Sequence, residues 1–323
     1  MLNIQSWLKK LGQSHVYALS LVVRDHSCRW VYGEVRVGAQ LSFQRIMASG
    51  GYDLKGVAQT DVGVVQSEDW IRIIRQCMGQ LPANYPKPKS LVVCLPAKNA
   101  YFGEITASQG EDEQSIRYQV EDLLEAASGN SDREAAFDWQ VKAPLSDGTL
   151  AMAVAGIDLR HIEEIQAACA YLKMQCRGVT LDNVASLNGY LQMLPKVRRD
   201  SSLGLLLHGE LSKHRIRLAV FAQGVLLNES LDHNDEGFSV VQAISALERL
   251  VVSWSRDHRD DQSGGVSLIL GGELMASKGI DLTIKRSGVL SPLWVEVVPR
   301  RELSARWHDD VVPFGALEAL PCA

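Results

Sequence analysis

A glycine pair at the end of an apolar strand is the strongest candidate for chemistry in this sequence. The stretch SLILGGELMASKGI, residues 267–280, runs from the strand through Gly271 and Gly272 into a polar turn. Because glycine has no side chain, such a pair lets backbone N–H groups approach an anion, as many phosphate sites do. The same pair can simply bend the chain, and a lone glycine motif favours the bend. The choice depends on what the rest of the chain places beside it.

Other polar clusters lack the spacing of a catalytic or metal site. Residues 232–236 (DHNDE) and 256–261 (RDHRDD) combine His with carboxylates, but neither has an HExxH-type spacing, which favours solvated loops. A GxSxG motif and a Walker loop are also missing from the sequence. The six cysteines are scattered without a CxxC pair and indicate small buried side chains in a reducing compartment. We therefore predict no metal site and no catalytic residue.

The composition is that of an ordinary globular protein with room for two domains. The 323 residues are 46% apolar, and the formal net charge of -5 argues against nucleic-acid binding. An uninterrupted apolar run of the roughly 18 to 20 residues that a membrane span needs does not occur, and the N-terminus lacks a signal-peptide core. We expect a cytoplasmic protein.

The elements that position the glycine pair form a repeated pattern. Three strands are predicted at 16–23, 28–37 and 41–47, followed by a helix whose apolar face recurs every three or four residues from Trp70 to Leu81, with Ser67 as its cap. Three more are predicted at 203–208, 214–222 and 225–231, again followed by a helix, with the apolar stripe Val240, Ile244, Leu247, Val251 and Trp254. A further strand follows in each half, at 90–96 and at 266–272. The pattern predicts a duplicated α/β fold.

The first half carries material that the second half lacks. Between the strand at 90–96 and the strand at 149–157 lie a further strand, a helix with an acidic first turn and the strand FDWQVKA, which predict a small α+β insertion. We place the first lobe at 1–84 and 149–200, the inserted subdomain at 85–148 and the second lobe at 201–323.

The order and spacing of five segments resemble one protein family. These segments are LVVCLPAKNAYFGEITAS (91–108), FDWQV (137–141), AVAGIDLRHIEEIQAACAYLKMQCRGVTLDNVASLNGYL (153–191), LILGGELMASKGI (268–280) and VPFGALEAL (312–320). Together they resemble the PilM-like type IV pilus assembly proteins of the actin-like ATPase superfamily, especially the MshI branch of mannose-sensitive haemagglutinin (MSHA) pili. The resemblance implies an actin-like (ribonuclease H-like) duplicated fold. The cytoplasmic GspL-like components of type II secretion are a related alternative.

The resemblance also implies a function and a location. A PilM-like protein would be a scaffold at the inner face of the inner membrane, associated with that membrane through its partners. It would hold the cytoplasmic tail of a bitopic PilN-like protein near the border of the inserted subdomain, and it would contact the pilus assembly ATPase. The partner-binding residues remain unassigned.

Departures from the family pattern bear on ATP hydrolysis. Active members have an Asp-x-Gly at a strand end in each half, whereas this chain has ALSLVVRDHSCR (18–29), with Asp25 in a turn without glycine, and Leu207 where the second carboxylate would stand. Carboxylates hold the metal and position water in phosphoryl transfer. We therefore expect no hydrolysis and no cofactor, with Gly271 and Gly272 as a vestigial nucleotide loop where residual ATP binding stays possible. The alternative is a nucleotide-binding ATPase or kinase-like enzyme.

Overall fold

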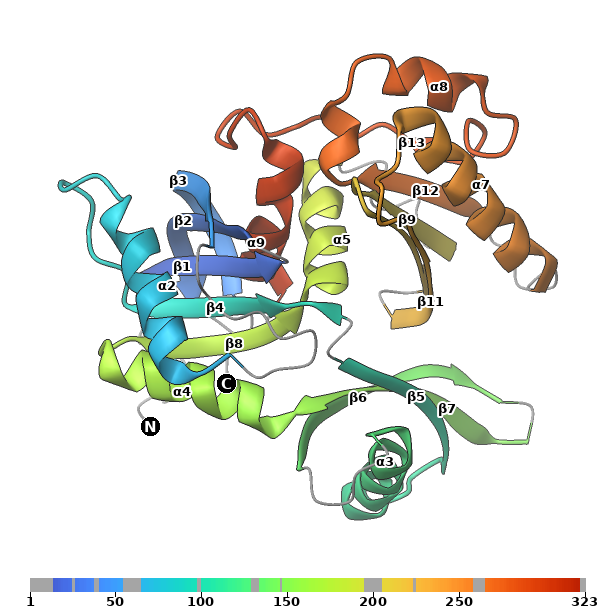
Figure 1. Ribbon diagram of the computed structural model, residues 1–323. Helices are drawn as coiled ribbons and strands as arrows, with labels where there is room; N and C mark the ends of the chain where they lie inside the picture. The colour runs from blue at the N-terminus through green and yellow to red at the C-terminus, as the bar shows by residue number, and fades with distance from the viewer. Residues whose placement is uncertain are drawn as a thin grey trace, which may run out of the picture. The chain divides into compact units, whose positions relative to one another are not determined.

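Alternating apolar positions build the first of two similar sheets (Figure 1). The computed structural model describes residues 14–24, 27–37, 41–54, 65–97, 100–128, 134–145, 147–194, 205–222, 225–257 and 265–319. Strands β1 (Ser14–Arg24), β2 (Ser27–Val37) and β3 (Leu41–Asp53) form an antiparallel meander. Strands β4 (Ser90–Leu95) and β8 (Gln175–Leu181) lie parallel to β1, which gives the order β3-β2-β1-β4-β8.

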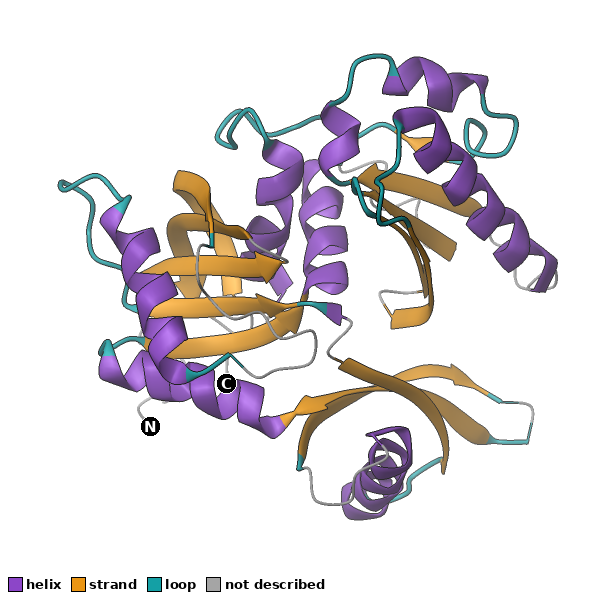
Figure 2. Ribbon diagram, in the orientation of Figure 1, coloured by secondary structure: helices purple, strands orange, loops and turns teal. Residues whose placement is uncertain are grey.

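Two helices cover one face of this sheet (Figure 2). They are α2 (Ser67–Gly79), which buries Trp70 and Ile73, and α4 (Leu159–Tyr171), which buries Ile165. Because side chains alternate along a strand, Leu19 and Leu21 of β1 point into the core that these helices close. The predicted cap of α2 differs, since the residue before the helix is Gln66 and the Ser67 N–H donates to Glu164 Oε2 of α4 at 2.6 Å.

The second sheet repeats the order of the first. Strands β9 (Leu205–Leu211), β10 (Arg215–Ala222) and β11 (Val225–His233) form an antiparallel meander, and β12 (Val266–Gly271) and β13 (Trp294–Val295) follow in parallel in the order β11-β10-β9-β12-β13. Helix α7 (Val240–Asp257) packs its predicted apolar stripe on this sheet. Two short helical segments follow β12, η3 (Glu273–Ala276) and α8 (Ile280–Arg286). The predicted duplication is confirmed by these matching strand orders.

The inserted subdomain is a three-stranded sheet with one helix. Strands β5 (Ala100–Ser108), β7 (Thr149–Asp158) and β6 (Ala135–Pro144) pair in that order, and α3 (Glu113–Ser128) packs on one face through Val120 and Leu124. The pairing corrects the predicted borders of 85–148, because β4 belongs to the first sheet and β7 is the central strand of the inserted one. The subdomain therefore runs from Ala100 to Asp158.

The chain divides into two compact units. One unit comprises Met1–Asn188, Glu302–Ser304 and Val312–Ala323, and the other comprises Gly189–Arg301 and Ala305–Val311. The borders fall within α5 (Asp182–Met193) and α9 (Trp307–Ala319), rather than near residue 200 as predicted. The composition of a continuous helix does not change at such a border. The border was therefore predicted in the polar segment that follows α5.

Candidate functional site

The glycine pair closes β12 against a buried tyrosine of α5. A Cβ built on Gly271 would overlap the phenol ring of Tyr190, and the Gly272 N–H donates to the Tyr190 hydroxyl at 3.2 Å. Gly272 has φ 95°, and a Cβ there would lie 2.6 Å from the Leu211 carbonyl oxygen, so only glycine fits. The backbone N–H of Gly272, in the bend that the sequence identified as a vestigial nucleotide loop, donates to a side chain of the same unit.

Tyr190 is itself held by aromatic neighbours. Its side chain is fully buried, its hydroxyl lies 2.9 Å from His308 Nδ1, and its ring packs near those of His208 and Trp307. Burial lowers the pKa of His308 to about 3, so this imidazole is neutral at physiological pH. The hydroxyl can then accept from Gly272 and donate to Nδ1. The glycine bend is part of a closed polar network, which the sequence analysis missed because Tyr190 lies 82 residues before Gly272.

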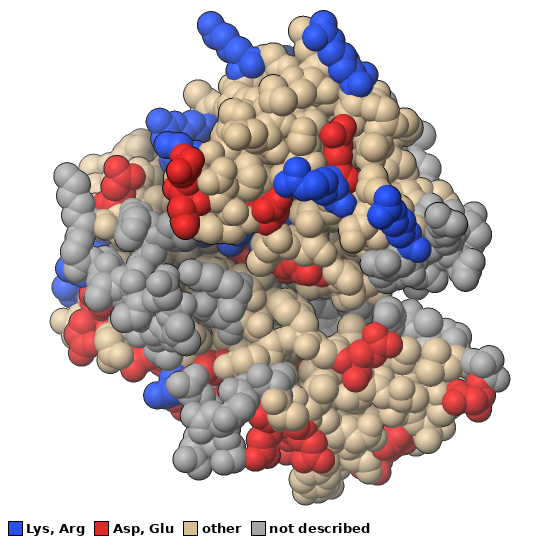
Figure 3. All heavy atoms as spheres, turned by 45° about the vertical axis from the view of Figure 1, so that its right-hand side comes forward, with Lys and Arg blue, Asp and Glu red and all other residues tan. Residues whose placement is uncertain are grey.

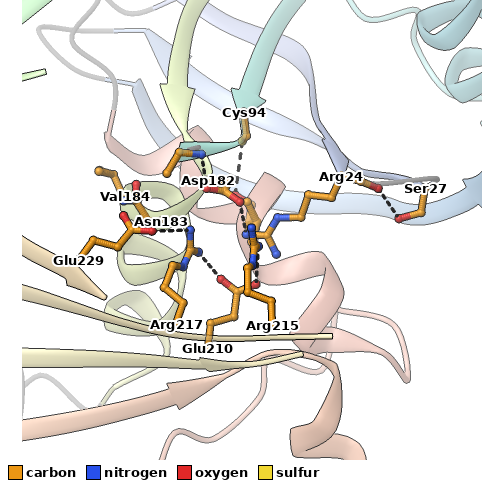
Figure 4. Close-up of polar contacts among 12 residues, drawn as sticks. Arg24, Ser27, Cys94, Asp182, Asn183, Val184, Glu210, Arg215, Arg217 and Glu229 are labelled. Atoms are coloured by element: carbon orange, nitrogen blue, oxygen red, sulfur yellow. Dashed lines mark hydrogen bonds and ion pairs between the residues drawn. The ribbon is translucent and has the colours of Figure 1, made fainter. Parts of the chain in front are cut away.

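The carboxyl end of β1 carries an arginine where the family pattern has Asp-x-Gly. Arg24 Nη2 lies 2.7 Å from Asp182 Oδ2, at the first residue of α5 (Figure 4). Asp182 is fully buried and also accepts from the Ala97 N–H at 2.9 Å. Burial, and then the negative charge of Asp182, raise the pKa of the nearby Cys94 thiol. This strand end thus holds a carboxylate, but an adjacent guanidinium compensates its charge.

The second sheet has a similar buried ion pair at the end of β9. Glu210 is buried beside Arg217 of β10, in hydrogen-bond contact, and Arg217 Nη1 also lies 3.7 Å from Glu229 Oε1 of β11 (Figure 4). Leu207, which stands where the family carboxylate was expected, packs with the core on the opposite, α7-covered face. Neither Asp182 nor Glu210 was predicted, because each is a single carboxylate without a motif around it.

An open groove of about 680 Å³ lies along the inserted subdomain and the start of α4. It is lined by Tyr101, Arg117, Glu121, Leu124, Glu125, Glu134, Ala135, Ala136, Phe137, Asp158 and Leu159. Arg117 spans part of it, with its guanidinium 5.3 Å from the Phe137 ring centroid and Nε 3.2 Å from Glu121 Oε1. The groove therefore combines an aromatic and aliphatic floor with carboxylates, which suits a segment of mixed apolar and basic side chains.

One groove carboxylate is fixed by the helix that follows it. Asp158 caps α4 by accepting from the Arg160 N–H at 3.0 Å, and it pairs with the Arg160 guanidinium at 3.0 Å. Burial alone would raise the pKa of Asp158, but the hydrogen bonds and charge of Arg160 outweigh it and hold the pKa below its usual value. Asp158 is therefore ionised at neutral pH.

The subdomain around the groove is strongly acidic. Residues 100–158 contain twelve Asp and Glu against three Lys and Arg, a formal net charge of -9, whereas the whole chain has -5. Figure 3 shows many acidic and few basic side chains on the lowest part of the view, where this subdomain lies. The rest of the chain is net positive, so negative charge is concentrated in the inserted subdomain.

No protein-family model and no curated protein matches the sequence. Among solved structures, the chain is similar to the PilM-PilN type IV pilus biogenesis complex, with a TM-score of 0.59 and 12% identity over 93% of this chain and 96% of that one. The fold is PilM-like and actin-like. This likeness confirms the fold class and, at the level of the fold, the resemblance that the sequence motifs indicated.

Two further structures match with lower TM-scores. One is a Bacteroides thetaiotaomicron protein with an actin-like ATPase fold and unknown function, at a TM-score of 0.45 and 12% identity over 92% of this chain and 94% of that chain. The other is the cytoplasmic domain of EpsL, an inner membrane component of the type II secretion system of Vibrio cholerae, at a TM-score of 0.44 and 15% identity over 79% and 82%.

The polar cluster at 232–236 lies at the surface. Asp232 pairs with Arg249 at 2.8 Å, and the exposed His233 pairs with Asp235 at 2.8 Å. Residues 258–261 of the second cluster lie outside the described residues. Within the described part of the chain, no group of three or more His, Cys, Asp and Glu could hold a metal ion. The helices described there include none long and apolar enough to cross a membrane.

Proposed function

We propose that this chain is a non-enzymatic scaffold of type IV, MSHA-like pilus assembly. It would work in the cytoplasm, at the inner face of the inner membrane, where it would hold the cytoplasmic tail of a bitopic PilN-like protein and contact the assembly ATPase. The observation that carries the proposal is the shared fold: 93% of the chain aligns with the structure of a PilM-PilN complex. The five sequence segments that resemble PilM-like proteins support the same function.

The groove of the inserted subdomain is the docking place that suits such a tail best. Its lining includes the Tyr101 and Phe137 rings, which can contact apolar side chains, and four carboxylates, which can attract lysines or arginines. An extended peptide gains affinity from apolar side chains in pockets, while complementary charges guide its approach and fix its register. We therefore expect an extended tail with at least one basic residue.

Binding can be tested with a labelled peptide that copies the N-terminal cytoplasmic segment of the PilN-like protein from the same genome. Fluorescence anisotropy should show saturable binding that weakens as salt is raised. The double substitution Glu121→Lys and Glu125→Lys should weaken it by at least about tenfold, since it places two cations beside a basic peptide. Asp122→Lys is the matched control, because Asp122 is exposed on the same helix but does not line the groove. Equal losses in both variants would reject the groove as the docking place.

The proposal that the chain does not hydrolyse ATP is supported by the two strand ends. Mg²⁺ needs carboxylate oxygens that are open to it, whereas Asp182 and Glu210 are buried and ion-paired with arginines. The Gly272 N–H donates to Tyr190. A phosphate-release assay with ATP and Mg²⁺ should therefore give no turnover above a buffer blank. Magnesium-dependent release that is lost in a folded Asp182→Asn variant would favour the ATPase alternative.

A further inference from the structure

The strand starts of the first sheet lie beside two segments of the chain that contain no acidic residue. Residues 70–89 run from α2 through a loop to the start of β4, and residues 165–177 run from α4 through a turn into β8. Figure 1 shows the ends of both helices and the starts of both strands at one edge of this sheet, on the left of the view. Together the two segments contain six Lys and Arg residues and no Asp or Glu. Positive charge is therefore gathered at this edge.

Most of these cations are not compensated within the described residues. Arg72 pairs with Asp69 at 2.6 Å. In the part of the chain that the structure describes, the other five make no ion pair; we call them the basic edge, and they are Arg75, Lys87, Lys89, Lys173 and Arg177. All are exposed except the half-buried Arg177, whose Nε donates to Ser90 Oγ at 3.4 Å. The basic edge thus carries a formal charge of +5.

Backbone contacts hold these segments beside one another. The Gln175 N–H donates to the Lys89 carbonyl at 2.8 Å, which joins the starts of β4 and β8. The loop before β4 is held by the Tyr32 hydroxyl, which donates to the Pro86 carbonyl at 2.5 Å. Lys173, with φ 54°, lies in the turn between α4 and β8. The lysines are therefore presented on a backbone that hydrogen bonds fix to the sheet.

The acidic groups of the same helices lie at their opposite ends. Glu68 and Asp69 are in the first turn of α2, and Glu163 and Glu164 are near the start of α4. On the sheet, Glu34 of β2 lies in register two strands away from the start of β4. The inserted subdomain, with its net charge of -9, joins β4 at its carboxyl end and α4 at its amino end. Positive and negative charge are thus separated along β4 and α4.

We propose that the basic edge binds the anionic headgroup surface of a phospholipid membrane. Clusters of about four to eight Lys and Arg residues bind such surfaces. Three of the five cations are lysines, whose compact, strongly hydrated ammonium suits a diffuse negative surface, whereas arginine favours paired hydrogen bonds to a single carboxylate. The Tyr171 ring is 63% exposed, lies 5.3 Å from the Arg75 guanidinium and can enter the headgroup region, where aromatic rings with a polar end are favoured.

The charge separation gives this contact one orientation. An anionic surface attracts the basic edge and repels the inserted subdomain, so the strand starts of the first sheet would face the lipid and the groove would face away from it. A tail could then occupy the groove while the basic edge touches the membrane. The contact itself needs no partner protein.

The test is co-sedimentation of the full chain with vesicles that contain no protein. Vesicles of phosphatidylcholine with about 30% phosphatidylglycerol should bind the chain, pure phosphatidylcholine should not, and binding should weaken as salt is raised. The triple substitution Lys87→Glu, Lys89→Glu and Lys173→Glu should weaken binding at least about a hundredfold, since each lysine near such a surface contributes about fivefold.

A matched control separates the basic edge from net charge. Lys278→Glu, Lys285→Glu and Arg286→Glu change three exposed cations of the second unit, so the total charge changes equally, and binding should stay within about threefold of that of the unsubstituted chain. Glutamine at the same six positions repeats the comparison with smaller charge changes. Because the vesicles contain no protein, this result is independent of tail docking, and the basic-edge variant should bind the PilN-like peptide as before.

Several results would overturn the proposal. The first is an absence of binding to the anionic vesicles, or equal binding to pure phosphatidylcholine. Equal losses in the two triple variants would reduce the effect to net charge. Displacement from the vesicles by millimolar inorganic phosphate at constant ionic strength would indicate a discrete phosphate site instead. Reversible self-association in sedimentation velocity without vesicle binding, lost in the basic-edge variant, would assign the basic edge to the acidic subdomain of a second copy.

Discussion

The substitution Gly271→Ala tests whether the glycine pair serves packing or a ligand. Gly271 does not have a positive φ, so alanine meets no backbone strain there. The added methyl would instead overlap Tyr190, which is fully buried. Overpacking of this kind costs about 1 to 3 kcal/mol in free energy of unfolding. Gly288→Ala is the matched control, since a Cβ at Gly288 meets nothing within 4 Å.

The expected difference between these variants follows from the packing. Gly288→Ala should be neutral or should stabilise the protein by up to about 1 kcal/mol, because alanine lowers the conformational entropy of the unfolded chain. Gly271→Ala should destabilise it, and most of that loss should vanish in a Tyr190→Leu background, where the overlapping ring atoms are gone. The coupling free energy should be at least about 1 kcal/mol, measured by chemical denaturation of the four proteins in the cycle.

Two outcomes would refute this reasoning. In the first, Gly271→Ala is as harmless as Gly288→Ala, or its cost is unchanged without the tyrosine ring. In the second, millimolar ATP raises the denaturation midpoint of the unsubstituted protein but not that of Gly271→Ala, which would assign the glycine a role in nucleotide binding.

Three further predictions concern buried ionisable side chains. Arg24→Met should cost about 3 to 5 kcal/mol, because it leaves the buried Asp182 carboxylate uncompensated, and chemical denaturation measures it. Arg217→Met should cost a similar amount, whereas the double variant Glu210→Leu with Arg217→Met should recover most of it; a double variant as unstable as the single one would contradict this. His308 has a pKa lowered to about 3, so the unfolded chain takes up a proton below about pH 6.5 while the folded chain does not. Stability should be full above about pH 6.5 and fall by up to about 1.4 kcal/mol per pH unit towards pH 3, and His308→Gln should reduce that slope in denaturation curves measured across this range.

Local sequence patterns were sufficient to predict the strands and helices that repeat in the two halves of the fold. The apolar run at 16–23 predicted strand β1, and the spacing of three and four placed Leu247 and Val251 on the buried face of α7. Both signals depend on neighbours in sequence, which is why they were predicted. The partner of a strand is a nonlocal property, so β7 was assigned to the wrong sheet even though its existence was predicted.

The candidate site was less predictable because its contacts join distant residues. The sequence predicted the bend at Gly271 and Gly272, but the tyrosine that explains it comes from another helix. The cap of α2 is a similar case, since the acceptor for Ser67 comes from Glu164 of α4 rather than from the residue beside the helix. Asp182 opens α5 after an apolar strand, and nothing in its surroundings distinguishes it from an ordinary first-turn acid.

The two strand ends and the inserted subdomain differ in how their acidic side chains are balanced by cations. Strand order and core packing depend on apolar alternation, so they persist without open carboxylates at the strand ends. At those ends, Arg24 and Arg217 compensate the buried acids and Tyr190 occupies the glycine bend. A buried ion pair adds little net stability over an apolar pair, so these residues keep the strand ends closed rather than strengthen the fold. The net negative charge lies instead on the inserted subdomain, where the proposed basic tail would bind.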